Sequence, residues 1–148
     1  MLTKLHAAAG ALALLMITGF WSATALSELF GTAATIATVK TGILYAMAVM
    51  IPAMATAGAT GARLGRGMKL PQVRVKLTRM KVIAANGLLI LLPSAIFLAI
   101  RAQAGQFDSA FVAVQGIELL AGAVNITLLA LNMRDGLRLK TRRQRARA

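Results

Sequence analysis

Four long apolar stretches alternate with short polar segments along the chain. They cover residues 7–27, 33–60, 82–100 and 109–133. Each approaches or exceeds the roughly 20 residues that an α-helix needs to cross a bilayer. None alternates in period two, which excludes the strands of an outer-membrane barrel. The pattern predicts an all-α integral membrane protein, an up-and-down bundle of four transmembrane helices.

The fourth stretch carries polar and small residues along a single helical face. Steps of three and four residues connect Asp108, Phe111, Gln115, Glu118, Gly122, Asn125, Leu129 and Asn132. Residues at these spacings lie on the same side of a helix. A charged side chain at the centre of a membrane helix costs roughly 2.5–3.5 kcal/mol on insertion scales. We therefore expect this face to point into the bundle, toward protein, water or a ligand.

The composition agrees with a membrane protein, and the distribution of charge predicts how the chain is oriented in the membrane. The chain is 58% hydrophobic and 14% charged, with a mean hydropathy of +0.72 and a formal net charge of +13. Its basic residues concentrate in a loop over 61–81 and in a tail over 134–148, whereas the other two connections hold Glu28, Arg101 and Asp108. Positive charge on alternate loops marks the cytoplasmic side. This predicts both termini and the 61–81 loop in the cytoplasm (N-in, C-in), with the protein in the bacterial inner membrane.

The domain organisation follows from the same pattern. Residues 1–133 are expected to form the transmembrane domain, and 134–148 a disordered or lipid-associated cytoplasmic tail. The basic residues suit anionic lipid headgroups. They lack interleaved aromatic residues or a nucleic-acid-binding module, so nucleic acid is not a predicted partner. The chain has no cysteine, hence no disulfide or thiolate metal site. Ala23-Thr24-Ala25 resembles a signal-peptide cleavage site, but an uncleaved first helix is preferred because the apolar run is long.

Lys40 and Glu118 are the leading candidates for an intramembrane site. Counted from the outer end of its helix, Lys40 lies at a depth of roughly 10 Å, Gln115 at a similar depth, and Glu118 about one turn deeper. Opposite charges at neighbouring depths in a membrane are expected to pair. The pair could be a proton or ion relay, or a contact for the headgroup of a ligand. It could equally be a structural ion pair that fixes the register of two helices.

His6 and three asparagines are expected at the cytoplasmic half of the bundle. His6 is either an interfacial residue or a single axial ligand for haem iron. Asn86, Asn125 and Asn132 are predicted to be hydrogen-bond links between helices. The glycines between Gly58 and Gly67 are expected to end the second helix, and Pro93 to kink the third. Residues 73–81 are expected to extend the third helix or to lie along the headgroups.

Five short phrases stand out along the chain: 5–7 (LHA), 20–22 (FWS), 27–31 (SELFG), 118–125 (ELLAGAVN) and 131–136 (LNMRDG). Together they resemble a group of small, uncharacterised four-helix inner-membrane proteins of proteobacteria. This resemblance implies a fold and a compartment but no activity.

A second set of phrases consists of Leu5-His6, Val39-Lys40, and Asn86 with Arg79 or Met80 upstream. This set is similar to the membrane-bound protoporphyrinogen IX oxidase family and to copper-resistance D-type membrane domains. The similarity implies that His6 is a haem ligand and that Lys40 is an important polar partner. In that family the two helices are expected to enter from the same side, whereas the topology here places His6 and Lys40 at opposite ends.

Three functions remain open from the sequence. The first is a redox membrane protein that binds haem b through His6, or a quinone, with Lys40 and Glu118 forming a polar site. The second is a non-enzymatic accessory or assembly subunit, in a homo-oligomer or a larger membrane complex. The third is a small transporter subunit, which needs oligomers because four helices are few to enclose a pathway. Neither paired carboxylates, a metal-ligand cluster nor a Ser-His-Asp set stands out.

Overall fold

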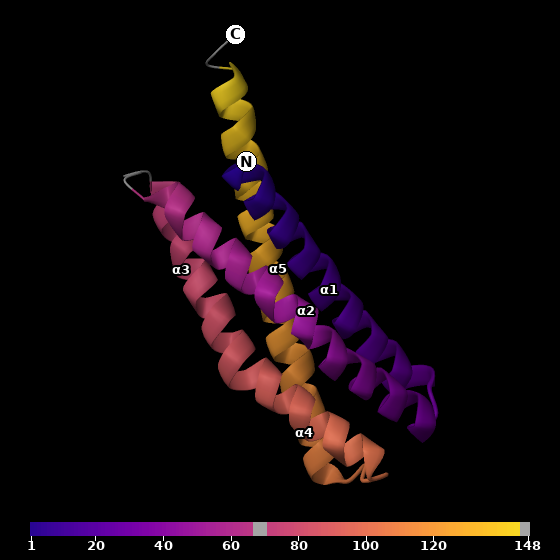
Figure 1. The fold of residues 1–148 in the computed structure, drawn as a ribbon. Coiled ribbons are helices and arrows are strands. Elements are labelled where there is room, and N and C mark those ends of the chain that lie inside the picture. Colours follow the sequence, from indigo (N-terminus) through magenta and orange to yellow (C-terminus); the bar gives the residue numbers. More distant parts are fainter. Residues whose placement is uncertain (67–70, 146–148) are drawn as a thin grey trace.

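The computed structural model describes residues 1–66 and 71–145, and every regular element among them is helical (Figure 1). The elements are α1 (Leu2–Phe30), α2 (Ala33–Gly65), α3 (Pro71–Asn86), the π-helical segment η1 (Gly87–Leu91), α4 (Leu92–Gln103) and α5 (Ser109–Arg145). Because α3, η1 and α4 are continuous, the chain folds into four long helical rods. All four are long and apolar enough to cross a membrane. The predicted four-helix membrane bundle is confirmed.

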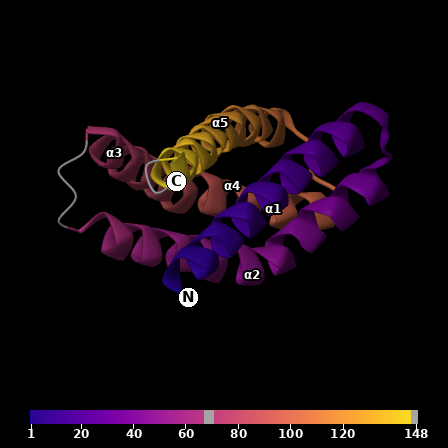
Figure 2. The same ribbon diagram turned by 90° about the horizontal axis from the view of Figure 1, so that it is seen from above.

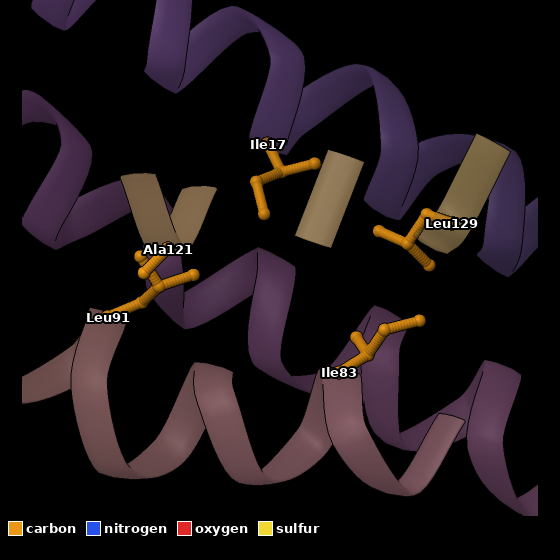
Figure 3. Packing of buried hydrophobic residues seen from close by; sticks show 5 residues of the cluster. All are labelled: Ile17, Ile83, Leu91, Ala121 and Leu129. Atoms are coloured by element: carbon orange, nitrogen blue, oxygen red, sulfur yellow. The ribbon is translucent and has the colours of Figure 1, made fainter. Parts of the chain in front are cut away.

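The rods run alternately up and down. The start of α1 and the end of α5 lie at one end of the bundle, which we call the terminal end (Figure 1). The α1–α2 and α4–α5 connections lie at the other, the turn end. Viewed from above, α1 and α2 follow one side of the molecule and α3 and α5 the other (Figure 2). Buried side chains from α1, α3, η1 and α5 meet between them: Ile17, Ile83, Leu91, Ala121 and Leu129 (Figure 3).

Glycines do not end α2 where the sequence suggested. The helix continues through Gly58 and Gly61 to Gly65. A Cβ on Gly61 would lie 3.0 Å from the ring of His6, and one on Gly65 would lie 3.0 Å from a methyl of Val73. These glycines let α1 and α3 approach closely, as small residues do between membrane helices. Packing thus offsets their poor helix propensity.

The helices are also longer than the apolar stretches that predicted them. α3 begins at Pro71, so residues 73–81 extend the third rod instead of forming part of a loop. α5 continues beyond Met133 to Arg145, so the start of the predicted tail is helical rather than disordered. Gly67 and Lys69 of the predicted loop and Arg147 of the tail lie outside the described residues.

Pro93 produces the expected irregularity in the third rod. Proline has no N–H to donate to the carbonyl four residues earlier. The preceding turn is widened into the π-helical segment η1, in which the Leu92 N–H donates to the Gly87 carbonyl. The rod changes direction between α3 and α4 (Figure 1). Such wide turns and prolines are the usual causes of a sharp bend in a helix.

Candidate intramembrane polar site

The predicted pair forms: Lys40 of α2 and Glu118 of α5 make a salt bridge. Lys40 Nζ lies 2.5 Å from Glu118 Oε2. The side chains of Lys40 and Glu118 are 1% and 12% exposed, respectively. Gln115, one turn before Glu118, donates from Nε2 to the same carboxylate oxygen at 3.3 Å. The two helices therefore bring opposite charges together in the protein interior.

A second carboxylate, Glu28 of α1, belongs to the same cluster and was not expected from the sequence. The sequence placed Glu28 in a turn, but α1 extends to Phe30 and holds it on the helix. Glu28 is close enough to Lys40 and Glu118 for their charges to interact. The sequence does contain a pattern that would have predicted this position. Ile17, Thr24 and Glu28 are spaced by seven and four residues, so they share one face of a helix that continues past residue 27. We call Glu28, Lys40, Gln115 and Glu118 the Lys40 cluster.

Two buried oxygen atoms of the Lys40 cluster have no hydrogen-bond partner among the described residues. They are Oε1 of Glu28 and Oε1 of Gln115. A buried polar atom without a partner costs about 1–3 kcal/mol. Natural proteins contain few such atoms, and each calls for an explanation.

A small cavity adjoins the cluster, with a volume of about 50 Å³. It is lined by Ile17, Phe20, Trp21, Thr24, Ile43, Met47, Met50, Leu91, Ala95, Glu118, Leu119 and Gly122. Glu118 is the ionisable group of this lining, which is otherwise mainly apolar. The volume holds a few water molecules, since one requires roughly 10–15 Å³ on this scale. We call it the Trp21–Glu118 cavity.

Trp21 is fixed in the wall of this cavity by α5. Its Nε1–H donates to the Leu119 carbonyl at 2.9 Å. Its ring rests on Gly122, where a Cβ would come within 3.0 Å of Trp21 Cδ1. Gly122 of the polar stripe therefore provides the space in which the indole packs.

The remaining stripe residues face inward, as predicted, apart from the first. Phe111, Gln115, Asn125, Leu129 and Asn132 are all buried. Asp108 instead caps the start of α5, where its Oδ1 accepts from the Phe111 N–H at 3.0 Å. This hydrogen bond, aided by the nearby Arg101 guanidinium, holds the pKa of the Asp108 carboxyl below its ordinary value.

The three asparagines connect α3 to α5. Asn86 donates to the Ala121 carbonyl at 2.8 Å and to Asn125 Oδ1 at 2.9 Å. Asn125 donates in turn to the Ile83 carbonyl at 3.3 Å. Nearer the terminal end, Asn132 accepts from Arg79, which also forms a salt bridge of 2.7 Å with Asp135. These contacts are those of interhelical hydrogen-bond links.

His6 is far from the Lys40 cluster, as the topology predicted. Its Nδ1 lies 3.0 Å from the Ala57 carbonyl and 3.1 Å from Thr60 Oγ1. Thr60 and Lys40 are twenty residues apart on α2, or about 30 Å along the helix. A carbonyl can only accept, so the bond to Ala57 requires the proton on Nδ1 and leaves Nε2 as the basic nitrogen of the neutral ring. One haem cannot contact both His6 and Lys40.

Fold and site together define a multi-pass membrane protein with a cluster of acidic and basic side chains inside its bundle. The described residues contain no group of three or more His, Cys, Asp or Glu side chains able to hold a metal ion. Comparison of the chain with protein-family models, curated proteins and solved structures gives no match.

Proposed function

We propose that this protein resides in a bacterial inner membrane and binds a small lipid-soluble molecule with a polar ring, of the quinone class, in the Trp21–Glu118 cavity. The supporting observation is the lining: apolar and aromatic side chains surround one carboxylate that is tied to Lys40. Ligand sites are typically concave and apolar, with few polar groups that fix orientation. A quinone supplies reversible redox chemistry when bound.

Each part of the cavity has a role in such binding. Glu118 accepts a hydrogen bond from a ring hydroxyl of the reduced form, and Lys40 keeps the carboxylate oriented. Phe20 and Trp21 provide flat apolar surface for the ring. A ring needs more room than about 50 Å³. We expect Met47 and Met50 to provide this room by changing rotamer, because methionine is unbranched and adaptable.

Trp21 is the single tryptophan of the chain and serves as a built-in reporter. The protein in lipid nanodiscs is titrated under anaerobic conditions with a short-chain benzoquinol, the reduced form that carries the ring hydroxyl, while Trp21 fluorescence is recorded. We expect a saturable quenching phase whose Kd rises about tenfold in Glu118→Gln, the loss of one hydrogen bond to a charged group. Ala95→Leu fills the cavity and should abolish the phase. The matched control is Ala85→Leu, the same change at an exposed position. Quenching that is linear in quinol concentration and equal in all four proteins refutes the proposal.

Haem b binding through His6 is a second candidate, favoured by the tautomer of the imidazole. A metal-ligating histidine commonly donates its other N–H to a backbone carbonyl, as Nδ1 does to Ala57. His6 would provide one axial ligand, and the chain has no second histidine to provide another. The purified protein should then show a Soret absorption band that His6→Ala removes. A colourless preparation from haem-supplemented cells refutes this function.

The distribution of charge supports the N-in, C-in orientation. Basic residues accompany both chain termini and the α2–α3 connection, where they suit anionic headgroups. The natural absence of cysteine makes labelling direct. We expect a membrane-impermeant maleimide to label Gln106→Cys in spheroplasts, and Thr3→Cys only after permeabilisation. The reverse pattern refutes the orientation.

A further inference from the structure

The Lys40 cluster combines two carboxylates with one ammonium group. Glu28, Lys40 and Glu118 come from three different helices and interact electrostatically. If all three are ionised, the cluster carries a net charge of −1. Arg101 of α4 does not compensate this charge, because it forms its salt bridge with Asp108. An uncompensated charge inside a membrane protein is costly, and the cluster gains free energy by taking up one positive charge.

The buried oxygen atoms without partners show that the Lys40 cluster also lacks hydrogen-bond donors. Gln115 is 6% exposed, and its amide lies against Glu118, yet its Oε1 has no donor among the described residues. Oε1 of Glu28 is also buried without a donor. Carboxylates and amide carbonyls only accept hydrogen bonds, whereas a protonated carboxyl donates one. One bound proton therefore supplies both the missing charge and a missing donor.

We propose that Glu28, Lys40, Gln115 and Glu118 form a proton-binding site that holds one exchangeable proton on its two carboxylates. The proton forms an O–H bond with a carboxylate oxygen and changes the net charge of the cluster from −1 to zero, with no electron transferred. The site stands independently of the cavity ligand.

The order of the groups along the bundle gives the proton a route. Glu28 is two residues from the end of α1, Lys40 is seven residues into α2, and Glu118 is nine residues into α5. Measured from the turn end of each helix, these positions are about 3, 10 and 14 Å deep. Glu28 is thus the carboxylate of the Lys40 cluster that lies nearest the turn end, and Glu118 borders the Trp21–Glu118 cavity. In the proposed site, Glu28 is therefore the group through which the proton exchanges with water.

The composition of the chain allows a direct count of the bound protons. Glu28 and Glu118 are its two glutamates, so ¹³C label in the glutamate side-chain carboxyl reports on this site alone. Solid-state NMR of the protein in sodium-free liposomes at neutral pH distinguishes protonated from ionised carboxyls. We expect one protonated carboxyl in the wild type, none in Glu28→Gln or Glu118→Gln, and two in Lys40→Met. Asp108→Asn, a matched change at the exposed Arg101 salt bridge, should leave the count at one.

The number of protonated glutamate carboxyls tests the proton site in the absence of any quinone. Two ionised carboxyls in the wild type overturn it, as does a protonated carboxyl that persists in Glu28→Gln. Carboxyl signals that stay ionised but shift on addition of sodium ions also overturn it, in favour of a metal-cation site. If Lys40→Met does not fold, the numbers of protonated carboxyls in the wild type and in Glu28→Gln still test the proposal. A normal count with no Trp21 quenching refutes the quinone proposal and leaves the proton site intact.

Discussion

Removing both carboxylates of the Lys40 cluster tests whether Lys40 is a buried charge that depends on them. The side chain of Lys40 is 1% exposed, and its ammonium group contacts Glu118. Removing the partner of a buried charge costs about 3–5 kcal/mol. Glu118→Gln alone should fall below this range, because the Glu28 carboxyl still interacts electrostatically with Lys40. The double variant Glu28→Gln/Glu118→Gln removes both carboxylates of the Lys40 cluster, and its loss of stability should reach this range.

The free energy of unfolding can be measured in mixed micelles by raising the SDS fraction while following Trp21 fluorescence. Adding Lys40→Met to Glu118→Gln should restore most of the stability, because replacing a buried ion pair by groups of similar size is often neutral. The corresponding single and double variants at Arg101 and Asp108 serve as a comparison. Because these side chains are more exposed, we expect a much smaller interaction energy between them. A double glutamate variant whose free energy of unfolding lies within about 0.5 kcal/mol of the wild-type value would show that Lys40 does not depend on these carboxylates.

Three further predictions concern α5. Asn125→Leu removes the amide that connects α5 to α3 and should lower the free energy of unfolding by about 1–2 kcal/mol in the same assay; no change would contradict its role as a link. Gly122→Ala should displace the Trp21 ring and shift its emission, and an unchanged spectrum would show that the contact relaxes freely. The Asp108 carboxyl, whose pKa is lowered by the Phe111 N–H, stabilises the first turn of α5 above the ordinary value of 3.8. This stability is lost as pH falls through the lowered pKa, and hydrogen exchange of that turn should then accelerate in the wild type but not in Asp108→Asn.

The Lys40 cluster and the Trp21–Glu118 cavity meet at a single residue, Glu118. Its carboxylate pairs with Lys40, accepts from Gln115 and borders the cavity. A proton on the cluster and a ligand in the cavity would therefore influence each other through this side chain. Quinol titrations of the wild type and Glu28→Gln at several pH values measure that coupling. We expect the pH dependence of the Kd to be weaker in Glu28→Gln.

The sequence alone determined the class of the protein and the direction of its polar face. Length and hydropathy of the four stretches suffice for spanning helices, because the bilayer requires each span to be apolar and internally hydrogen-bonded. The spacing of the polar residues on α5 predicted an inward face, and depth alone predicted the contact of Lys40 with Glu118. Both predictions follow from the cost of exposing a charge to lipid.

Only the tertiary structure decided which groups join these residues and where the helices end. Glu28 enters the cluster because α1 continues past the apolar stretch and lies beside α2 and α5. Gly61 and Gly65 remain helical because His6 and Val73 pack against them. Such outcomes depend on which helices are neighbours and how closely they approach. Hydropathy along a single chain does not contain that information, because lipid and a neighbouring helix are nearly equivalent apolar surroundings.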